Sequence, residues 1–320
     1  MDYALRLGRR AQGTTAENPN VGSVIVREGL LAGIGWTQPG GRPHAETEAL
    51  NMAGAKASGA TAYVTLEPCA HHGRTPPCAE ALVQAGIARV VTAIEDPDPR
   101  VSGAGHAILR AAGIEVVTGI GAEDARRDLA GFLSRIVRNR PYVILKLALS
   151  ADGMIAAEAG VRTAITGPEV KARVHLLRAQ CDAILVGMET VLADDPELTC
   201  RLPGLEDRSP RPFVMSRSRE LPPGSHLARR GATILSGTVA DALGTLAGLG
   251  INRLMIEGGA AIARIFLAAG VVDEVVLFRS PNMLDPRGLK GLDETALQPF
   301  AIREQEKLGV DTLTVYERPN

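Results

Sequence analysis

The sequence predicts an α/β protein built from two domains. Its 320 residues exceed what one ordinary hydrophobic core holds and suit two cores. Apolar runs of strand length alternate with helical segments along most of the chain, which favours sheets covered by helices. A helical segment over residues 122–137 ends in Arg138-Asn139-Arg140-Pro141, and a new strand follows at once. We therefore predict one domain over residues 1–140 and a second over residues 141–320.

The first domain is expected to open with a helix and a β-hairpin. Residues 1–12 read as the helix, and the turn-forming Asn18-Pro19-Asn20 follows it. Strands over 21–27 and 30–35 flank Glu28-Gly29, a two-residue hairpin connection. The remaining predicted elements of this domain are helices over 45–55, 79–85, 108–112 and 122–137, and strands over 62–66, 90–94 and 115–117.

The second domain is expected to continue the alternation of strands and helices. We predict a strand over 142–149, a helix over 168–180, a strand over 183–187, a strand over 253–256 and a helix over 260–269. Gly258-Gly259 stands between the last strand and helix, where backbone N–H groups can hold a phosphate, although such pairs also serve ordinary tight packing. The pair is not part of a G-x-G-x-x-G, so a Rossmann dinucleotide site is not predicted.

Composition excludes several classes of function. The chain is 45% hydrophobic and 22% charged, its net charge is −1, and aromatic residues make up 3%. Neither a basic footprint nor a stacking platform for nucleic acid is therefore expected. The first ten residues include Asp2, Arg6, Arg9 and Arg10, no apolar run reaches membrane-spanning length, and cysteines are few. We expect a cytoplasmic protein with no nucleic-acid and no membrane partner.

The strongest chemical signal is His44-Ala45-Glu46 together with Pro68-Cys69 and Pro76-Pro77-Cys78. One imidazole and two thiolates fill three positions of a tetrahedral Zn²⁺ and leave the fourth open for water. Glu46 stands where it can move protons of that water, and H-x-E with P-C is the pattern of zinc nucleobase deaminases. The sequence therefore predicts a hydrolytic zinc site with His44, Cys69 and Cys78 as ligands and Glu46 as catalytic acid and base.

Two simpler readings compete with this prediction. Two cysteines can form a disulfide, and a His with two Cys can hold a structural zinc. Prolines stiffen the loop that presents both sulfurs, and the helix that follows Cys78 favours a thiolate at its N-terminus. These features favour the catalytic site, although eight residues, rather than two, separate the cysteines.

Further short motifs accompany the zinc pattern along the chain. In the first half they are Asn18-Pro19-x-Val21-Gly22, Pro43-His44-Ala45-Glu46, Thr65-Leu66-Glu67-Pro68-Cys69, His72-Gly73-Arg74-Thr75-Pro76-Pro77-Cys78 and Asp96-Pro97-Asp98-Pro99. In the second half they are Leu145-Lys146-x-Ala148-x-Ser150-x-Asp152-Gly153, Ile184-Leu185-Val186-Gly187, Thr190-Val191-Leu192-Ala193-Asp194-Asp195-Pro196, Leu198-Thr199-x-Arg201 and Glu257-Gly258-Gly259. With these motifs, nearly the whole chain resembles the bifunctional deaminase/reductase family of riboflavin biosynthesis.

The resemblance implies a cytidine-deaminase-like α/β/α domain followed by a dihydrofolate-reductase-like α/β domain. It implies that the first domain removes the 2-amino group of 2,5-diamino-6-ribosylamino-4-pyrimidinone 5′-phosphate by hydrolysis. The second would use NADPH to reduce the ribosyl group of the product to ribityl. Homo-oligomers are also implied.

The resemblance assigns site residues as well. In the first domain it gives substrate contacts to Asn18, Arg74, Asp96 and Asp98. A guanidinium meets a phosphate with two hydrogen bonds, which favours Arg74 on physical grounds. Asp-Pro steps also start turns, which is the simpler reading of Asp96 and Asp98.

For the second domain the resemblance places Asp194 beside the reacting carbon. The substrate contacts that it implies are Arg178, Leu198, Arg201 and Glu257, with the two arginines on the phosphate. The NADPH contacts that it implies are Thr166, Thr190, Asp194, Gly258 and Gly259. A helix cap or a turn is the alternative role for Asp194.

The second half departs from the family pattern at several points. Arg162 and Ala164 stand where Ser and Trp are usual, Ser216 replaces an Asp, and the region over 227–250 reads as short of a strand and a helix. A deaminase whose second domain is only structural or oligomerising is therefore the alternative to a two-step enzyme.

Overall fold

The computed structural model describes residues 1–72, 76–158, 163–284 and 288–319. The chain divides into two compact units, Met1–Arg140 and Pro141–Asn320, and each is described by itself. Over the part of the chain that the structure describes, no helix combines the length and the apolar character needed to cross a membrane.

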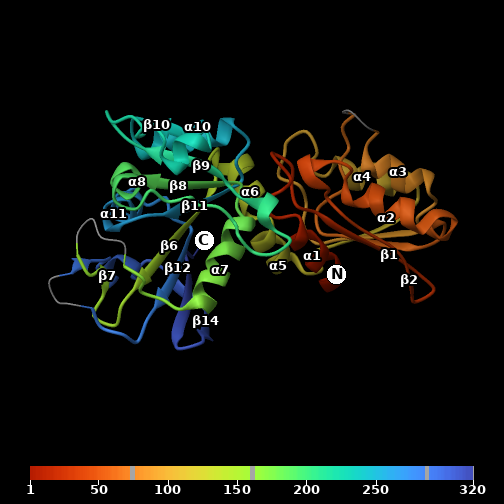
Figure 1. Cartoon of the computed structure of the whole chain (residues 1–320). Coiled ribbons are helices and arrows are strands. Elements are labelled where there is room, and N and C mark those ends of the chain that lie inside the picture. Colours follow the sequence, from red (N-terminus) through yellow and green to blue (C-terminus); the bar gives the residue numbers. More distant parts are fainter. Residues whose placement is uncertain (73–75, 159–162, 285–287, 320) are drawn as a thin grey trace. The chain divides into compact units, whose positions relative to one another are not determined.

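Unit 1 is a sheet between two layers of helices (Figure 1). Its helices are α1 (Asp2–Arg10), α2 (Ala45–Ala53), α3 (Cys78–Gln84), α4 (Ala104–Ala111), α5 (Ala122–Asp128) and α6 (Ala130–Arg138), with short 3-10 helices η1 (Pro39–Gly41) and η2 (Gly54–Ala57). Its strands are β1 (Gly22–Arg27), β2 (Leu30–Trp36), β3 (Thr61–Val64), β4 (Arg89–Thr92) and β5 (Glu115–Thr118).

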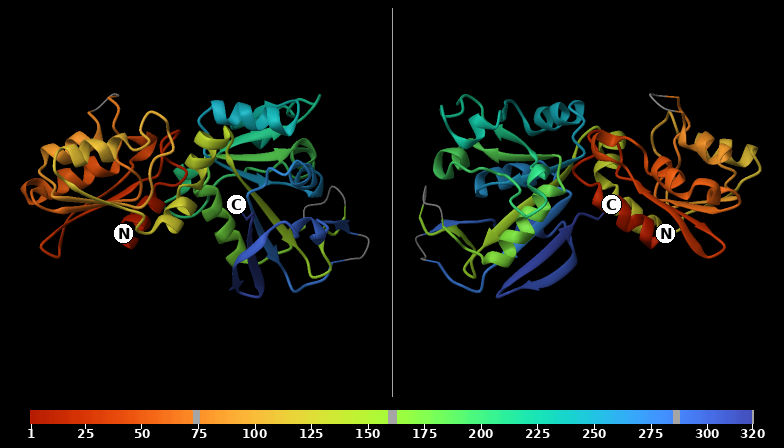
Figure 2. Two further views of the ribbon diagram at one scale, coloured as in Figure 1. Left: turned by 180° about the vertical axis from the view of Figure 1, so that it is seen from behind. Right: turned by 45° about the vertical axis from the view of Figure 1, so that its right-hand side comes forward.

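The sheet of unit 1 has the strand order β2-β1-β3-β4-β5. The hairpin strands and the β1–β3 pair are antiparallel, and β3, β4 and β5 run parallel. Helices α2, α3 and α4 cover one face around Ile25, Ala49, Leu82 and Leu109, while α1 and α5 cover the other (Figures 1 and 2).

Helix α2 lies directly on strand β2 because the strand has glycines at the contact. A Cβ atom added to Gly33 would lie 2.1 Å from the Ala49 carbonyl oxygen, and one added to Gly35 would lie 2.1 Å from that of Ala45. Any side chain at these two positions would push the helix away. This close contact fixes the position of the start of α2, and therefore the positions of His44 and Glu46.

The long helix predicted over residues 122–137 is two helices, α5 and α6, which meet at Leu129. The carbonyl oxygen of Asp128 accepts hydrogen bonds from Gln12 Nε2 at 3.1 Å and Asn20 Nδ2 at 3.2 Å. Side-chain amides thus take up an acceptor that a continuous helix would use for its own backbone. Both amides come from distant segments, so local periodicity could not predict the break.

Unit 2 contains helices α7 (Pro168–Ala179), α8 (Met188–Asp194), α9 (His226–Arg229), α10 (Val239–Gly248) and α11 (Ala260–Ala268), with η3 (Glu206–Arg208) and η4 (Glu294–Leu297). Its strands are β6 (Tyr142–Leu149), β7 (Met154–Ala156), β8 (Ala183–Gly187), β9 (Arg211–Met215), β10 (Thr233–Leu235), β11 (Arg253–Glu257), β12 (Glu274–Arg279), β13 (Leu289–Lys290), β14 (Ala301–Leu308) and β15 (Asp311–Glu317).

The main sheet of unit 2 has the order β10-β9-β8-β11-β6-β12-β15-β14. It is parallel from β10 to β12, and β15 and β14 complete it antiparallel. Helices α10 and α11 pack on one face around Leu145, Leu185 and Phe266. Since side chains alternate along a strand, the buried Ile144 and Ile184 point to the other face.

The segment over 227–250, which the sequence indicated to be short of a strand and a helix, holds both β10 and α10. Strand β10 pairs with β9 at the edge of the parallel part of the sheet. The segment therefore contributes a strand and a helix to unit 2. Ser216, at the end of β9, closes a turn in which its Oγ accepts from the Arg219 N–H at 3.0 Å.

The prediction also left out the strands at the end of the chain. Strands β12, β15 and β14 form the antiparallel part of the sheet, and the predicted pattern ended at the helix over 260–269. Strand β14 is largely exposed and consists mostly of charged and polar residues, so it lacks the apolar periodicity by which a strand is predicted.

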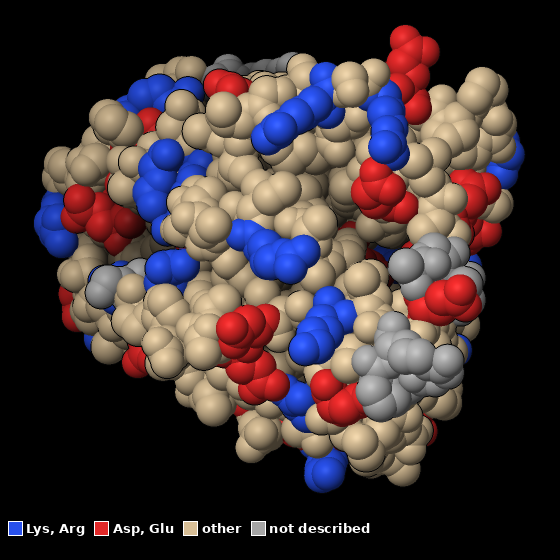
Figure 3. All heavy atoms as spheres, turned by 90° about the vertical axis from the view of Figure 1, so that its left-hand side faces the viewer, with Lys and Arg blue, Asp and Glu red and all other residues tan. Residues whose placement is uncertain are grey.

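Charge on the molecular surface is mixed. On the face shown in Figure 3, Lys and Arg side chains are interspersed with Asp and Glu, in keeping with the net charge of −1.

Candidate active sites

The predicted zinc ligands of unit 1 come from three places in the fold. His44 is the residue just before α2, Cys69 lies in the loop after β3, and Cys78 is the first residue of α3. Both cysteines are free thiols, so the disulfide alternative is wrong. The sulfur of Cys69 also accepts a hydrogen bond from the Cys78 N–H at 3.3 Å, which holds the two ends of the loop together.

Distances within this triad fit a tetrahedral zinc. Nδ1 of His44 lies 3.3 Å from the Cys78 sulfur and 3.7 Å from the Cys69 sulfur. Zn–N and Zn–S bonds of about 2.0 and 2.3 Å at tetrahedral angles place such ligand atoms about 3.6 Å apart. The three atoms belong to a single cluster in which all separations are within 4.8 Å. The donor set therefore fits Zn²⁺ and leaves one coordination position open.

Glu46 lies one residue into α2 and is 4% exposed. It does not belong to the ligand cluster. Burial, followed by the negative charge of Cys69, raises the pKa of Glu46 to about 7. A carboxyl group of this kind can take and return a proton near neutral pH.

A cavity of about 290 Å³ opens beside this triad. The predicted residues that line it are Asn18, His44, Glu46, Cys69, Asp96 and Asp98. Arg74, the predicted phosphate contact, lies outside the described residues. Three arginines that the sequence analysis missed also line the cavity, namely Arg42, Arg100 and Arg135. Arg42 directly precedes the motif with His44 and Arg100 directly follows the motif with Asp96 and Asp98, so two of the three adjoin quoted motifs.

The pKa values of the two aspartates in the cavity are shifted in opposite directions. Burial, and then the nearby charges of Asp98 and Glu67, raise the pKa of Asp96 to about 6. Asp98 instead pairs with Arg100, whose Nε lies 3.0 and 3.1 Å from its two oxygens, and this pairing lowers the pKa of Asp98.

With Asp96 as the substrate contact that the resemblance implies, the affinity for the deamination substrate is expected to fall as the pH falls through about 6, because protonation removes a hydrogen-bond acceptor from Asp96. Three nearby charges affect the pKa of Asp96: those of Asp98 and Glu67 raise it, and that of Arg100 lowers it. Below that pH, KM should rise about tenfold per unit, the limit for one titrating group. The measurement is KM for deamination between pH 5 and 8. The rise in KM at low pH should be absent in Asp96→Asn. If the rise persists in that variant, it comes from another group.

Unit 2 has a larger cavity of about 1250 Å³ at the carboxyl ends of the parallel strands β6, β8 and β11. The residues predicted for the second domain all line it: Thr166, Arg178, Thr190, Asp194, Leu198, Arg201, Glu257, Gly258 and Gly259. The position agrees with the general rule that ligands of α/β sheets bind outside the carboxyl ends of the strands. Asp194 is the exposed last residue of α8, and Arg162 lies outside the described residues.

A buried ion cluster forms part of the wall of this cavity. Arg178 donates to Glu257 from Nε at 3.0 Å and from Nη2 at 2.8 Å, and Lys146 Nζ lies 3.7 Å from the same carboxylate. Although burial raises the pKa of Glu257, the charges of Lys146 and Arg178 lower it to about 2. The sequence analysis missed Lys146, which stands beside Leu145 in a motif that it quoted.

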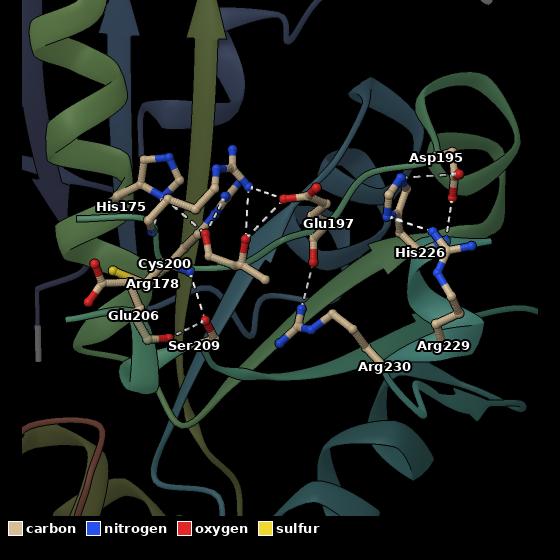
Figure 4. A network of polar contacts seen from close by, with 12 residues as sticks. His175, Arg178, Asp195, Glu197, Cys200, Glu206, Ser209, His226, Arg229 and Arg230 are labelled. Atoms are coloured by element: carbon tan, nitrogen blue, oxygen red, sulfur yellow. Dashed lines mark hydrogen bonds and ion pairs between the residues drawn. The ribbon is translucent and has the colours of Figure 1, made fainter. Parts of the chain in front are cut away.

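Arg178 also supports the loop that follows α8. Its Nη1 donates to the Thr199 carbonyl oxygen at 2.9 Å, so each of its nitrogens has a protein partner. Arg201 is exposed and donates to Glu197 at 2.7 Å and to Thr199 Oγ1 at 2.8 Å. Figure 4 shows Arg178 and Glu197 within the surrounding network of polar contacts. The two predicted phosphate contacts therefore differ in exposure. Arg178 is buried and all of its nitrogens are hydrogen-bonded within the protein, whereas Arg201 is exposed to solvent.

The glycine pair fits a bound dinucleotide. A Cβ atom at Gly258 would lie 2.6 Å from Ile262 Cγ2 and 3.5 Å from Thr190 Oγ1, whereas at Gly259 the nearest atom would be 4.0 Å away. Glycine at 258 lets the backbone approach α11 closely, and both glycines line the cavity just before α11 begins. Such a helix start favours a phosphate, as NADPH requires.

Two family models match the chain. Residues 1–94 match the cytidine and deoxycytidylate deaminase zinc-binding region. Residues 141–291 match the RibD C-terminal domain.

Curated relatives and solved structures agree with these matches. Riboflavin biosynthesis protein RibD of Escherichia coli is 41% identical over 353 aligned positions, which cover 97% of this chain and 96% of that protein. RibD of Aquifex aeolicus is 37% identical, with 99% and 97% covered. The structure of Acinetobacter baumannii RibD (form 1) superposes with a TM-score of 0.91 at 36% identity, covering 100% of this chain and 98% of that one.

A second solved structure is named for its activity. It is the diaminohydroxyphosphoribosylaminopyrimidine deaminase/5-amino-6-(5-phosphoribosylamino)uracil reductase of Thermotoga maritima. It superposes with a TM-score of 0.89 at 30% identity and covers 100% of this chain and 97% of that one.

Proposed function

Because the chain belongs to the family of riboflavin biosynthesis protein RibD, which joins a zinc-dependent deaminase to an NADPH-dependent reductase, we propose which residues perform each of its two reactions. Unit 1 would deaminate 2,5-diamino-6-ribosylamino-4-pyrimidinone 5′-phosphate, and unit 2 would reduce the ribosyl group of the product to ribityl. The observation that carries the first assignment is the buried Glu46 beside the His44, Cys69 and Cys78 cluster.

In unit 1, His44, Cys69 and Cys78 would hold the zinc ion. A zinc ion held there would lower the pKa of a bound water and so supply a nucleophile near neutral pH. Glu46 takes the proton of the attacking water and returns it to the departing ammonia. Asn18, Asp96 and Asp98 bind the pyrimidine and its ribosyl phosphate, and Arg74 is proposed to bind the phosphate.

In unit 2, Thr166, Thr190, Asp194, Gly258 and Gly259 are proposed to hold NADPH. This cofactor supplies the hydride that reduces the sugar carbon. Asp194 orients the sugar beside the cofactor, Arg201 holds the phosphate, and Leu198 and Glu257 complete the substrate site. Arg178 acts by fixing Glu257 and the Thr199 carbonyl.

A cytoplasmic location, a homo-oligomeric assembly and the absence of nucleic-acid and membrane partners remain part of the proposal. They rest on the family resemblance and on composition.

The assay that tests both reactions follows ammonia and NADPH in one sample. The diaminopyrimidine phosphate should release ammonia, and NADPH should then be oxidised in equal amount. Ammonia release without NADPH oxidation would leave a deaminase with a structural second unit.

Zinc removal separates the two units. Treatment with a chelator is expected to reduce deamination at least 100-fold, because the nucleophile depends on the metal. Reduction of the deaminated substrate should stay at its full rate, and added Zn²⁺ should restore deamination at one ion per chain. Metal analysis and the two assays on the same sample check this. Parallel loss of both activities would contradict separate sites.

A further inference from the structure

Glu67 is a buried carboxylate that the proposed reaction does not use. Its side chain is fully buried, and it lies between β3 and the zinc loop, two residues before Cys69. The ring nitrogen of His106 nearest to it is 3.8 Å away. Burial lowers the pKa of His106, so the ring is neutral at neutral pH and is not a counter-ion. A buried carboxylate is costly unless hydrogen bonds satisfy it.

Three backbone N–H groups supply those hydrogen bonds. Oε2 accepts from Asp96 at 3.2 Å and from Gly103 at 3.0 Å, and Oε1 accepts from His106 at 3.1 Å. Asp96 stands at one end of the loop after β4, while Gly103 and His106 stand at the start of α4. One carboxylate therefore closes both ends of the loop over residues 96–103.

That loop supplies two aspartates that line the deaminase cavity. Asp96 and Asp98 both line it, and the Asp98 N–H donates to Asp96 Oδ1 at 2.9 Å. Glu67 is also joined through Pro68 to Cys69, the first cysteine of the zinc loop. A Cβ atom at Gly105 would lie 2.0 Å from the Pro68 carbonyl oxygen and 3.1 Å from Glu67 Oε1, so α4 rests against this segment. Glu67 thus joins the metal-binding loop to the substrate loop.

A metal ion is not the better reading of this cluster. Glu67, Glu95 and His106 place one ligand atom each within 4.8 Å of the others. Both oxygens of Glu67 are already hydrogen-bonded to N–H donors. A cation bound to Glu67 would have to displace the backbone N–H groups that its carboxylate holds in place.

We propose that Glu67 is a positioning residue for deamination, which sets Asp96 and Asp98 at the correct distance from Glu46 and the zinc ligands. The proposal rests on the proposed function of unit 1. Glu67 also lines the cavity, but both of its oxygens already accept hydrogen bonds from backbone N–H groups, so it acts by holding those groups in place. Its effect should therefore appear in substrate binding and should depend on Asp96.

The test variant is Glu67→Gln, which keeps the size of the side chain but turns an amide toward backbone donors. KM for deamination is expected to rise roughly 10- to 100-fold, as for other residues that orient site groups, and kcat should change less than about threefold. Zinc should remain at one ion per chain, and the reductase activity of the same polypeptide should be unchanged. Glu95→Gln is the matched control, an exposed neighbour whose replacement should leave KM unaltered.

A double-mutant cycle separates positioning from plain stability. In an Asp96→Ala background, Glu67→Gln should raise KM by much less than it does alone, because its effect acts through Asp96. Wild-type KM in Glu67→Gln, or full additivity in the cycle, would overturn the proposal, as would loss of zinc with a fall in kcat at unchanged KM.

If Glu67→Gln does not fold, Glu67→Asp serves in its place. It keeps the charge and shortens the reach, so a several-fold rise in KM with full zinc is expected, and a wild-type KM would overturn the proposal. Failure of the wild-type protein to deaminate the pyrimidine would instead reject the proposed function.

Discussion

Replacing Glu46 by Gln is expected to lower kcat for deamination roughly 10²- to 10⁴-fold, the usual contribution of a general acid and base. The amide cannot accept the proton of water or return it to ammonia. Because Glu46 is outside the ligand cluster, zinc should stay at one ion per chain. The measurements are ammonia release, zinc content and NADPH oxidation on one preparation.

Glu48→Gln is the matched control for this prediction. Glu48 lies on the same helix, two residues further along, and is neither in the ligand cluster nor on the cavity. It should retain wild-type deamination. A Glu46→Gln protein that still turns over at the wild-type rate would remove Glu46 from the mechanism, and one that has lost its zinc would make it a structural residue.

Replacing Glu257 by Gln should have the largest effect on unit 2. The substitution removes the carboxylate partner of the buried Arg178 and of the partly exposed Lys146. Removing one partner of such a pair costs about 3–5 kcal/mol of stability. Loss of the substrate contact and of the support for Thr199 should lower reductase kcat/KM roughly 100-fold, which corresponds to about 2.7 kcal/mol. Deamination should be unaffected.

The stability effect of Glu257→Gln should depend on pH with a definite sign. A carboxyl whose pKa is lowered to about 2 stabilises the fold above its ordinary pKa, and this stabilisation is lost as pH falls toward 2. The difference in unfolding free energy between wild type and variant should thus be constant above about pH 5 and shrink below it. Denaturant unfolding at several pH values measures it.

Glu189→Gln is the control in the same cavity. Glu189 lines it, is 78% exposed and pairs with Arg219 at the surface. Exposed pairs contribute about 0–1 kcal/mol, so this variant should keep its stability. Equal losses in both variants would show that the charge of the cavity, and not the buried pair, is what matters.

Much of the chemistry was readable because it lies in short motifs. His44 and Glu46 are two residues apart, and Cys69 and Cys78 belong to one loop, so their types and spacing predicted a zinc site before any fold was known. The alternation of strands and helices predicted two α/β domains, because apolar periodicity is a local property of the chain. The predicted residues of the second domain then proved to line one cavity.

Tertiary structure alone decided what depends on distant partners. The break at Leu129 follows from amides of Gln12 and Asn20, and the pairing of Arg178 with Glu257 joins α7 to β11. Glu67 is the clearest case, since its partners are backbone N–H groups. Nearly every residue carries such a donor, so the sequence cannot mark which ones a buried carboxylate will meet. Only the path of the folded chain brings those donors to it.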